Sequence, residues 1–437
     1  MKLTIGNSSS RVEGLDTSQF QSLRKLLSYK INAAGAYFSG APSRERYLLS
    51  ARGEFPTGLV YLVYQWVIDT KTPLAIEDTR KCPKWLPGLF ALKLNHTPYP
   101  WQEDAATACF AHHRGVVVAP CGTGKSTVTA LIASRLQVPT LIVVPTLELR
   151  RQLTESLTEA FGGERVGRLG SALAVENVDA LDPKKPLRGY DCVIIDEFHR
   201  SAAKTYRQLN AKCWKDVYYR FGTTATAFRS NEDERLLLEG VLSQVIYRLD
   251  YKTAISNGYI VPLEAFYVEV PKTVTQSETW AGVYSDLVVD NEGRNHIIRK
   301  LAELLHGSNR SALTLVKEVE HAYKLSDTVA HAANEEAVKL IREFSQGERL
   351  SLTATAGLMG EGIDCRAAEY LIYAGLGKSK NALMQSFGRV LRKYPGKESG
   401  KVILFKDPSH RWTRDHFCKQ RKILLDEYGV SVVELKI

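Results

Sequence analysis

Apolar and polar positions follow three different patterns along the 437-residue chain. Residues 1–97 mix short apolar runs with two stretches of helical spacing, the first capped by Asp16, and this predicts a small α+β module. Trp66 and Trp85 are expected in the core of that module. The turn-rich stretch 95–100 then predicts a linker.

From residue 98 onward, short apolar runs alternate with helical patterns, which is typical of parallel sheets covered by helices. The runs predict strands at 115–119, 140–144, 191–195 and 217–222, and again at 312–316, 350–355, 370–374 and 401–405. We expect an α/β fold with two tandem parallel-sheet domains, 98–262 and 263–437, behind the module 1–97. Ligands of such sheets bind at the carboxyl ends of the strands.

Basic residues outnumber acidic ones by 58 to 48, and the net charge is +10. Residues 1–97 hold 13 Lys and Arg against 7 Asp and Glu, so +6 of this excess lies in the first fifth of the chain. A basic surplus favours a polyanionic partner, and nucleic acid is favoured over an acidic membrane because no basic amphipathic helix stands out. Simple solubility is the alternative explanation.

Neither secretion nor membrane insertion is indicated. No apolar run approaches the ~20 residues that cross a bilayer, and residues 1–5 lead into no apolar signal-peptide core. Seven cysteines without C-x-x-C spacing argue against a zinc site or a disulfide framework. We therefore expect a cytosolic protein, found in the host cytosol if a phage encodes it.

The strongest chemical signal is an apolar strand, 116–119, that runs into a glycine-containing loop and Gly-Lys-Ser before a helical pattern. This is the context of a phosphate-binding P-loop: backbone N–H groups surround the phosphates of a nucleotide such as ATP, Lys125 reaches the β- and γ-phosphates, and Ser126 holds Mg²⁺. Ala119 stands where the general pattern has glycine, and a small residue still fits. The expected nucleotide contacts are Pro120, Cys121, Gly122, Thr123, Gly124, Lys125, Ser126 and Thr127.

A second signal is the apolar strand 191–195, which ends in the adjacent carboxylates of Asp196 and Glu197. Asp196 would bind Mg²⁺, and Glu197 would orient and polarise the attacking water. His199 is placed to sense the γ-phosphate and relay its state. Acidic residues at a strand end are common on protein surfaces, but after a P-loop they indicate an ATPase.

Over residues 98–405 the chain resembles the superfamily 2 helicases, whose motifs occur here in the right order and spacing. The resemblance implies two RecA-like domains. It also implies that Gln102 hydrogen-bonds the adenine edge and that Tyr99 stacks on the ring. Further roles that it implies are nucleic-acid contact for Pro145 and Thr146, coupling of hydrolysis to movement for Thr224 and Thr226, and contact with both ATP and nucleic acid for Gly362 and Asp364.

The segment 385–392, Gln-Ser-Phe-Gly-Arg-Val-Leu-Arg, resembles the arginine element of the same helicases. Arg389 and Arg392 lie three positions apart and are expected to share one helix face. A fixed guanidinium can stabilise charge on a transferring phosphoryl group. The resemblance implies that Arg392 is the arginine finger, with Arg389 and Gln385 as further catalytic residues; salt bridging without phosphate is the alternative.

The signature Asp-Glu-Phe-His and the segment 222–229 resemble the DNA-directed set of RecG, XPB and UvsW-type helicases, although most of that set has Pro where Ala227 stands. The resemblance implies an ATP- and Mg²⁺-dependent DNA helicase or translocase acting on forks, displacement loops and Holliday-type junctions in replication, recombination or repair. A monomer is expected, with single-strand-binding or recombination proteins as partners. The alternatives are duplex translocation without strand separation, an RNA helicase, and a nucleic-acid-binding protein with an inactive ATPase.

Two regions lie outside the helicase motifs. Basic residues of the module 1–97 could follow the phosphates of a duplex, or the module could be a structural cap. Trp280 and Tyr284, in the polar stretch 272–290, could stack on a base at a fork or pack in a surface hairpin. The residues assigned to DNA are Arg44, Arg46, Arg52, Lys81 and Lys84.

Overall fold

The computed structural model describes residues 1–31, 44–198, 204–225, 232–359, 365–375 and 377–436. Contacts divide the chain into two compact units, Met1–Ala119 with Gly124–Arg248, and Pro120–Thr123 with Leu249–Ile437. Each unit contains one seven-stranded sheet. None of the described helices combines the length and the apolarity needed to span a membrane.

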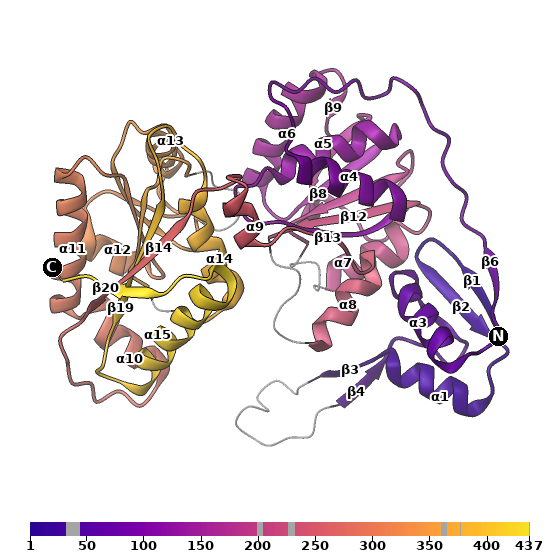
Figure 1. Ribbon diagram of the computed structural model, residues 1–437, viewed down its shortest axis with the longest axis horizontal. Helices are drawn as coiled ribbons and strands as arrows, with labels where there is room; N and C mark the ends of the chain where they lie inside the picture. The colour runs from indigo at the N-terminus through magenta and orange to yellow at the C-terminus, as the bar shows by residue number, and fades with distance from the viewer. Residues whose placement is uncertain (32–43, 199–203, 226–231, 360–364, 376, 437) are drawn as a thin grey trace. The chain divides into compact units, whose positions relative to one another are not determined.

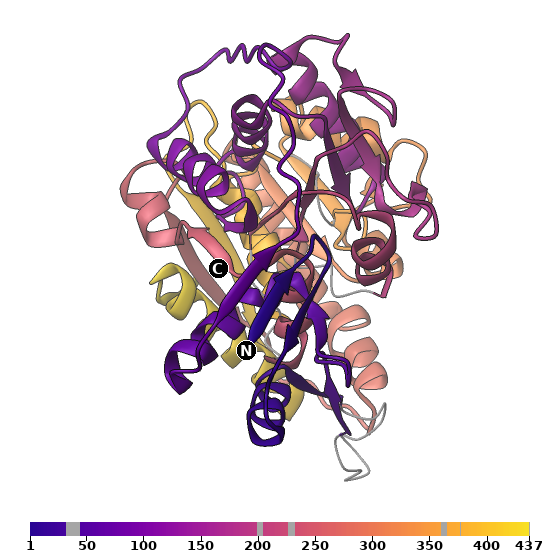
Figure 2. The same ribbon diagram turned by 90° about the vertical axis from the view of Figure 1, so that its right-hand side faces the viewer.

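Residues 1–78 form the α+β module that the patterning predicts (Figure 1, Figure 2). Its four-stranded sheet has the order β5-β2-β1-β6, and β3 and β4 form a separate antiparallel hairpin. Asp16 caps the first helix as expected, since its side chain accepts a hydrogen bond from the Gln19 N–H at 2.8 Å. The elements are β1 (Lys2–Ile5), β2 (Ser9–Glu13), α1 (Thr17–Leu26), β3 (Ser28–Ile31), β4 (Arg44–Tyr47), β5 (Glu54–Pro56), α3 (Val60–Thr70) and β6 (Ala75–Asp78).

The two tryptophans that were expected in the module's core differ in solvent exposure. Trp66 is buried, with 6% of its surface exposed, whereas Trp85 is 64% exposed, so its assignment to the core is wrong. Trp85 belongs to the segment 79–99, which has neither helix nor strand and runs along the first large domain. In that segment Phe90 is the buried aromatic residue, and its ring lies 5.5 Å from that of Phe161.

The first large sheet is fully parallel, with the order β13-β7-β12-β11-β8-β10-β9. Its central strands are buried over nearly their whole length, which explains why they read as continuous apolar runs. The strands are β7 (Arg114–Val118), β8 (Thr140–Val144), β9 (Val166–Gly167), β10 (Leu173–Asn177), β11 (Cys192–Asp196), β12 (Tyr219–Thr224) and β13 (Val245–Arg248). The helices are α4 (Pro100–His112), α5 (Lys125–Leu136), α6 (Leu147–Phe161), α7 (Lys204–Gln208) and α8 (Glu232–Leu242).

The module packs directly onto α8 of this domain. Leu236 of α8 packs against the module's apolar core, and the Tyr61 hydroxyl donates to the Glu239 carboxylate at 2.5 Å. At Gly58 the two parts approach so closely that an added Cβ would lie 2.0 Å from the Glu239 carbonyl oxygen. The module's apolar core therefore extends onto α8 of the first large domain.

Two buried arginines connect the turn between β1 and β2 to the amino edge of the first large sheet. Arg220, at the start of β12, donates to Ser8 Oγ at 2.8 Å and to the Asn210 side chain. Arg114, at the start of β7, donates to the Asn7 carbonyl oxygen. Burial lowers the pKa of Arg114 to about 9 and that of Arg220 well below its usual range.

The second large sheet is also fully parallel, with the order β16-β17-β15-β18-β19-β14-β20. Residues from Leu249 onward pack with this unit, and the ring of Tyr251 lies 4.3 Å from that of Tyr428. The strands are β14 (Leu263–Glu269), β15 (Ala312–Val316), β16 (Val329–Ala330), β17 (Ser351–Thr355), β18 (Tyr370–Tyr373), β19 (Gly400–Lys406) and β20 (Val432–Glu434). The helices are α9 (Tyr251–Ser256), α10 (Trp280–Tyr284), α11 (Glu292–Gly307), α12 (Val319–Leu325), α13 (Ala337–Gln346), α14 (Lys380–Gly388) and α15 (Arg411–Ile423).

The strands that the sequence predicts in the two large domains are all present, with ends within two residues of the prediction. The patterning missed β9, β10, β13, β14, β16 and β20, most of which are short or lie at sheet edges. Strand β10 was missed because it buries two polar residues, Glu176 and Asn177. The predicted fold class, two tandem parallel-sheet domains behind a small α+β module, is confirmed.

Candidate active site

Three neighbouring strands of the first sheet end at one edge and carry the nucleotide motifs. The P-loop follows β7, Asp196 ends β11, and Thr224 ends β12, which lies between the other two strands. The Ala119 N–H donates to the Thr224 carbonyl oxygen at 3.0 Å. Because parallel strands bring their carboxyl ends to the same edge, the predicted residues of this domain meet there.

The P-loop has the backbone conformation that surrounds an anion. Gly122 and Gly124 have φ angles of +84° and +88°, in the left-handed region that favours glycine. The Thr123 hydroxyl donates to the Pro120 carbonyl oxygen at 2.8 Å and closes the turn. Helix α5 begins at Lys125, so its positive dipole end lies at the loop, as phosphate binding requires.

Lys125 lies beside the acidic end of β11. Its Nζ is 3.7 Å from Glu197 Oε1, and both side chains are only 12% exposed. Burial, together with the neighbouring Glu197 carboxylate, raises the pKa of Asp196 to about 6, while Lys125 and a hydrogen bond from Thr223 oppose the rise. That bond, from Thr223 Oγ1 to Asp196 Oδ1, is 2.6 Å long. The sequence interpretation missed Thr223, whose only signal is a hydroxyl within a buried strand.

Replacing Asp196 with asparagine is expected to stabilise the nucleotide-free protein above pH 6 and to abolish ATP hydrolysis. The pKa of Asp196 is raised from its ordinary 3.8 to about 6, so its contribution to stability is fully present below pH 3.8 and is lost as the pH rises through 6. Asparagine still accepts the Thr223 hydrogen bond and carries no charge. We expect the free energy of unfolding at pH 8 to rise by an amount on the order of 1–3 kcal/mol. Thermal unfolding of the variant and the unmodified protein across pH measures this change. An equal or lower unfolding temperature at pH 8 would contradict the assignment.

Gln102 connects the start of α4 to the P-loop. Its Oε1 accepts a hydrogen bond from the Tyr99 N–H at 2.9 Å, and its Nε2 donates to the Gly124 carbonyl oxygen at 3.2 Å. The side chain is buried. Gln102 thus lies beside the nucleotide loop, as its predicted role requires, while contact with adenine stays a prediction.

Pro145 and Thr146 follow β8 and lie at the same edge of the sheet, one strand beyond β11. Thr146 caps α6, since its Oγ1 accepts a hydrogen bond from the Leu149 N–H at 3.2 Å. The adjacent Leu147 is largely exposed. Nucleic-acid contact by this pair stays a prediction.

In the second unit, Gln385 lies in α14, but Arg389 and Arg392 do not share one α-helical face. Helix α14 ends at Gly388, a 3-10 turn carries the chain to residue 391, and Arg392 has the extended angles φ −69° and ψ 140°. The expectation of a continuous helix is therefore wrong. The chain leaves the helix at this point and turns towards β19, and Pro395 disfavours helical angles at Tyr394, so the helix could not have continued much further. Burial lowers the pKa of Arg389 below its usual range.

Four predicted residues lie outside the part of the chain that the structure describes. They are His199, Thr226, Gly362 and Asp364.

The basic residues assigned to DNA do not form one surface. Arg46 lies on β4 and is exposed, and Arg52 is exposed in the loop before β5. Lys81 and Lys84 lie instead on the segment 79–99, where Lys84 lines a cavity at the amino edge of the first large sheet. Arg44 begins β4, and its side chain is not among those described.

Trp280 packs within the second unit. Its ring lies 4.5 Å from that of His416, 5.7 Å from that of Tyr284 and 6.0 Å from that of Trp412. This arrangement favours the packing interpretation over base stacking, although the residues form helix α10 and not a hairpin.

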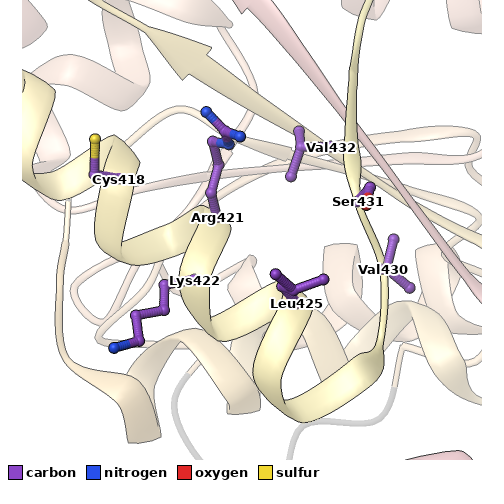
Figure 3. Close-up of a pocket in the computed structure, with 7 residues that line it drawn as sticks. All are labelled: Cys418, Arg421, Lys422, Leu425, Val430, Ser431 and Val432. Carbon is purple, nitrogen blue, oxygen red and sulfur yellow. The ribbon is translucent and has the colours of Figure 1, made fainter.

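Two cavities lined by described residues lie away from the motifs. One of about 800 Å³ is at the amino edge of the first sheet, between Pro139, Leu187 and Tyr190. Another, of about 290 Å³, is a groove between α15 and β20 (Figure 3). Its lining residues are Cys418, Arg421, Lys422, Leu425, Val430, Ser431 and Val432. Neither cavity contains a predicted nucleotide-binding residue.

Comparisons with known proteins find one matching family model and several similar helicases. Residues 95–229 match the family model described as type III restriction enzyme, res subunit. The ATP-dependent DNA helicase uvsW of Enterobacteria phage T4 is 22% identical over 437 aligned residues, covering 87% of this chain and 86% of that protein. The DNA 3'-5' translocase XPB2 of Sulfurisphaera tokodaii is 24% identical over 351 residues, covering 67% of this chain and 78% of that one.

The fold is also found in the restriction-modification enzyme LlaBIII, solved bound to DNA, with a TM-score of 0.57 and 14% identity over 85% of this chain and 34% of that one. The share of each relative's length that this chain spans varies. It spans only 43% of a similar protein from Sulfolobus islandicus filamentous virus.

Fold, motif order and relatives together support the resemblance of this chain to the superfamily 2 helicases. Within that class it resembles the UvsW-type and XPB helicases, as the motifs predict.

Proposed function

We propose that this protein is an ATP-dependent DNA helicase or translocase that remodels branched DNA, such as forks, displacement loops and Holliday-type junctions. The observation that carries the proposal is the convergence of Lys125, Asp196, Glu197 and Thr224 at one edge of the first sheet. Relatives named as DNA helicases and translocases support DNA as the substrate. A role in replication, recombination or repair, and a location in the host cytosol, belong to the same proposal.

In this proposal the P-loop amides and Lys125 hold the β- and γ-phosphates, and Glu197 orients the attacking water. Gln102 and Tyr99 contact the adenine base. Arg392 supplies the arginine finger, Arg389 and Gln385 support it, and Thr224 couples hydrolysis to movement. Pro145 and Thr146 contact the nucleic acid.

The residues at the end of β11 fit a Mg²⁺ ion. Asp196 and Glu197 are adjacent, largely enclosed carboxylates, and burial followed by the Glu197 charge raises the pKa of Asp196, although Lys125 opposes the rise. Hard oxygen ligands are those that Mg²⁺ prefers. Asp196 and the Ser126 hydroxyl, in the first turn of α5, are the protein groups that we assign to the ion, which would neutralise phosphate charge when bound.

Replacing Glu197 with glutamine is expected to preserve ATP binding and slow hydrolysis by at least about 10²-fold, the loss typical of one positioned acid–base group. Lys125 and Asp196 would still bind the phosphates and the metal, while the water would lose its oriented carboxylate. Single-turnover hydrolysis with equilibrium nucleotide binding separates the two effects. Near-normal single-turnover rates would remove Glu197 from this role.

The substrate class is tested by strand displacement on a matched panel of forks, four-way junctions, plain duplex and RNA–DNA hybrids, with ATP hydrolysis measured in parallel. We expect unwinding of forks and junctions. The name of the XPB2 relative favours a second candidate, translocation along duplex DNA without strand separation. That candidate predicts duplex-stimulated hydrolysis with no displaced strand. Hydrolysis that no DNA stimulates would contradict both.

A further inference from the structure

The groove of the second unit lies between a helix and a strand at the edge of the sheet. Its helical wall is α15 together with the π-helical turn Leu424–Tyr428 that continues it, and its other wall is the chain that leads into β20. Figure 3 shows Arg421 and Leu425 on the side of the helix that faces this chain, whereas the Lys422 side chain extends away from Val432. We call this feature the α15–β20 groove.

Strand β20 has a free edge. It ends the order of the second sheet and, among the described strands, pairs with β14 alone. The Leu435 N–H donates to the Tyr267 carbonyl oxygen at 2.8 Å. Because successive N–H groups of a strand alternate in direction, the Glu434 N–H points away from β14. Val433 is 58% exposed. The edge therefore offers backbone donors and acceptors to a further strand.

The walls of the groove combine apolar surface with positive charge. Leu425 is 54% exposed, and Val430 and Val432 are only partly buried. None of the seven lining residues is acidic, and two are basic. Among the described residues, no carboxylate lies within ion-pair distance of Arg421, whose guanidinium lies 5.8 Å from the centroid of the Phe417 ring.

Nearby carboxylates are engaged elsewhere. Glu427 pairs with Lys380, and Glu434 accepts a hydrogen bond from the Tyr267 hydroxyl at 3.3 Å. The charge of Arg421 is therefore available to an acidic partner.

These properties fit an extended peptide better than other occupants. A volume of about 290 Å³ lies at the lower limit of the roughly 300–1,000 Å³ typical of small-molecule sites, and a few side chains would fill it. The lining residues include no aromatic ring on which a nucleic-acid base could stack. A second copy of this chain would bring a second Arg421 to the same edge, and like charges repel.

We propose that the α15–β20 groove binds an extended acidic segment of another protein, which adds as a strand to the free edge of β20. Backbone hydrogen bonds to β20 supply affinity, and alternate side chains of the segment enter the groove. An apolar side chain covers Leu425 and Val432, and a carboxylate two positions away pairs with Arg421. The groove contains no residue assigned to ATP or DNA, so this inference goes beyond the proposed function and does not depend on it.

The first test uses a fluorescein-labelled peptide in which Thr alternates with Leu and Asp, so that Leu and Asp share one face of a strand. Its binding to the full chain is measured by fluorescence anisotropy at several salt concentrations. We expect saturable binding that weakens with salt. A peptide with Lys in place of Asp should bind more weakly. No saturable binding of the Asp peptide, or equal binding of the two peptides, would overturn the inference.

The charge is tested by Arg421→Gln, with Lys422→Gln as the matched control from the adjacent position. Loss of Arg421 should weaken binding of the Asp peptide by about fivefold at low salt, the upper range for one exposed ion pair. The Lys422 variant should bind nearly as the unmodified protein does, because that side chain extends away from Val432. Equal losses in the two variants would show a general charge effect and would contradict the site.

Strand addition is tested by Glu434→Pro against Glu434→Ala. Both variants lose the contact with Tyr267, but only proline removes the outward N–H, and the hydrogen bond from Leu435 to β14 is kept. The proline variant should bind the Asp peptide about 2- to 10-fold more weakly than the alanine variant, the net loss of one hydrogen bond. Equal affinities would rule out addition to this edge. Thermal unfolding confirms that each variant is folded.

The position of the peptide is tested by thiol labelling, because Cys418 lines the groove and Cys82, in the first unit, is the other exposed cysteine among the described residues. The Asp peptide should slow modification of Cys418 and leave that of Cys82 unchanged, as measured by mass spectrometry of the digested protein. Equal effects at the two cysteines would overturn the inference. So would a dimer that the peptide dissociates, or displacement of the peptide by a single-stranded oligonucleotide. DNA-stimulated ATP hydrolysis tests the proposed function separately.

Discussion

Replacing Lys125 with alanine is expected to lower ATP turnover by at least about 10²–10³-fold, the typical cost of losing one preorganised group that stabilises developing charge. The lysine is largely buried, and its Nζ lies 3.7 Å from Glu197 and 3.5 Å from the Ala119 carbonyl oxygen. It is thus already positioned between the P-loop and the acidic strand end. Steady-state hydrolysis with and without branched DNA measures the loss.

Binding of DNA without nucleotide should survive in this variant, because no predicted DNA contact depends on Lys125. A suitable control is Lys93→Ala, which removes a lysine from the segment 79–99, away from the P-loop. Normal hydrolysis in the Lys125 variant would refute the assignment of the P-loop. A parallel loss of DNA binding and of folded protein would indicate a structural role for the lysine.

Removing residues 1–97 is expected to leave a core that does not fold stably. The deletion exposes Leu236 and the face of α8 that packs against Gly58. It also removes the Asn7 carbonyl oxygen that the buried Arg114 donates to, and one of the several hydrogen-bond partners of Arg220. It also removes Phe90 from its packing against the first large domain. A buried polar group without a partner costs about 1–3 kcal/mol, and the several losses together approach the 5–15 kcal/mol that is the total stability of a typical protein.

The measurement is soluble yield and thermal unfolding of residues 98–437, with and without residues 1–97 added as a separate chain. The full chain with Tyr61→Phe is the mild control, since it removes one hydroxyl contact to Glu239. A truncated chain that unfolds within a few degrees of the full chain would contradict the extension of the module's core onto α8. DNA binding by the module is then best tested in the intact protein.

The geometry of the candidate nucleotide site was largely predictable because the residues of each motif are local in sequence. Glycines at 122 and 124, followed directly by Lys125, define a loop of fixed length at the start of a helix, and the structure has that loop. Likewise, Asp196 and Glu197 directly follow an apolar strand, so their place at a sheet edge follows from the strand alone. Because the strands of a parallel sheet end at the same edge, the two motifs are expected to lie close together once the sheet is known to be parallel.

The sequence by itself determined the fold class, the strands of both large sheets that carry the motifs, and the residues of the P-loop and acidic strand end, since each depends on short-range periodicity and spacing. Only the tertiary structure decided that Trp85 is exposed, that Thr223 supports Asp196, and that the helix of Gln385 ends before Arg392. It also decided that the module's core extends onto α8 and that Ser8 contacts Arg220, which lies 212 residues away. Local patterns indicate that a side chain will be buried or hydrogen-bonded. Which residue it packs against or bonds to depends on contacts between segments far apart in the sequence.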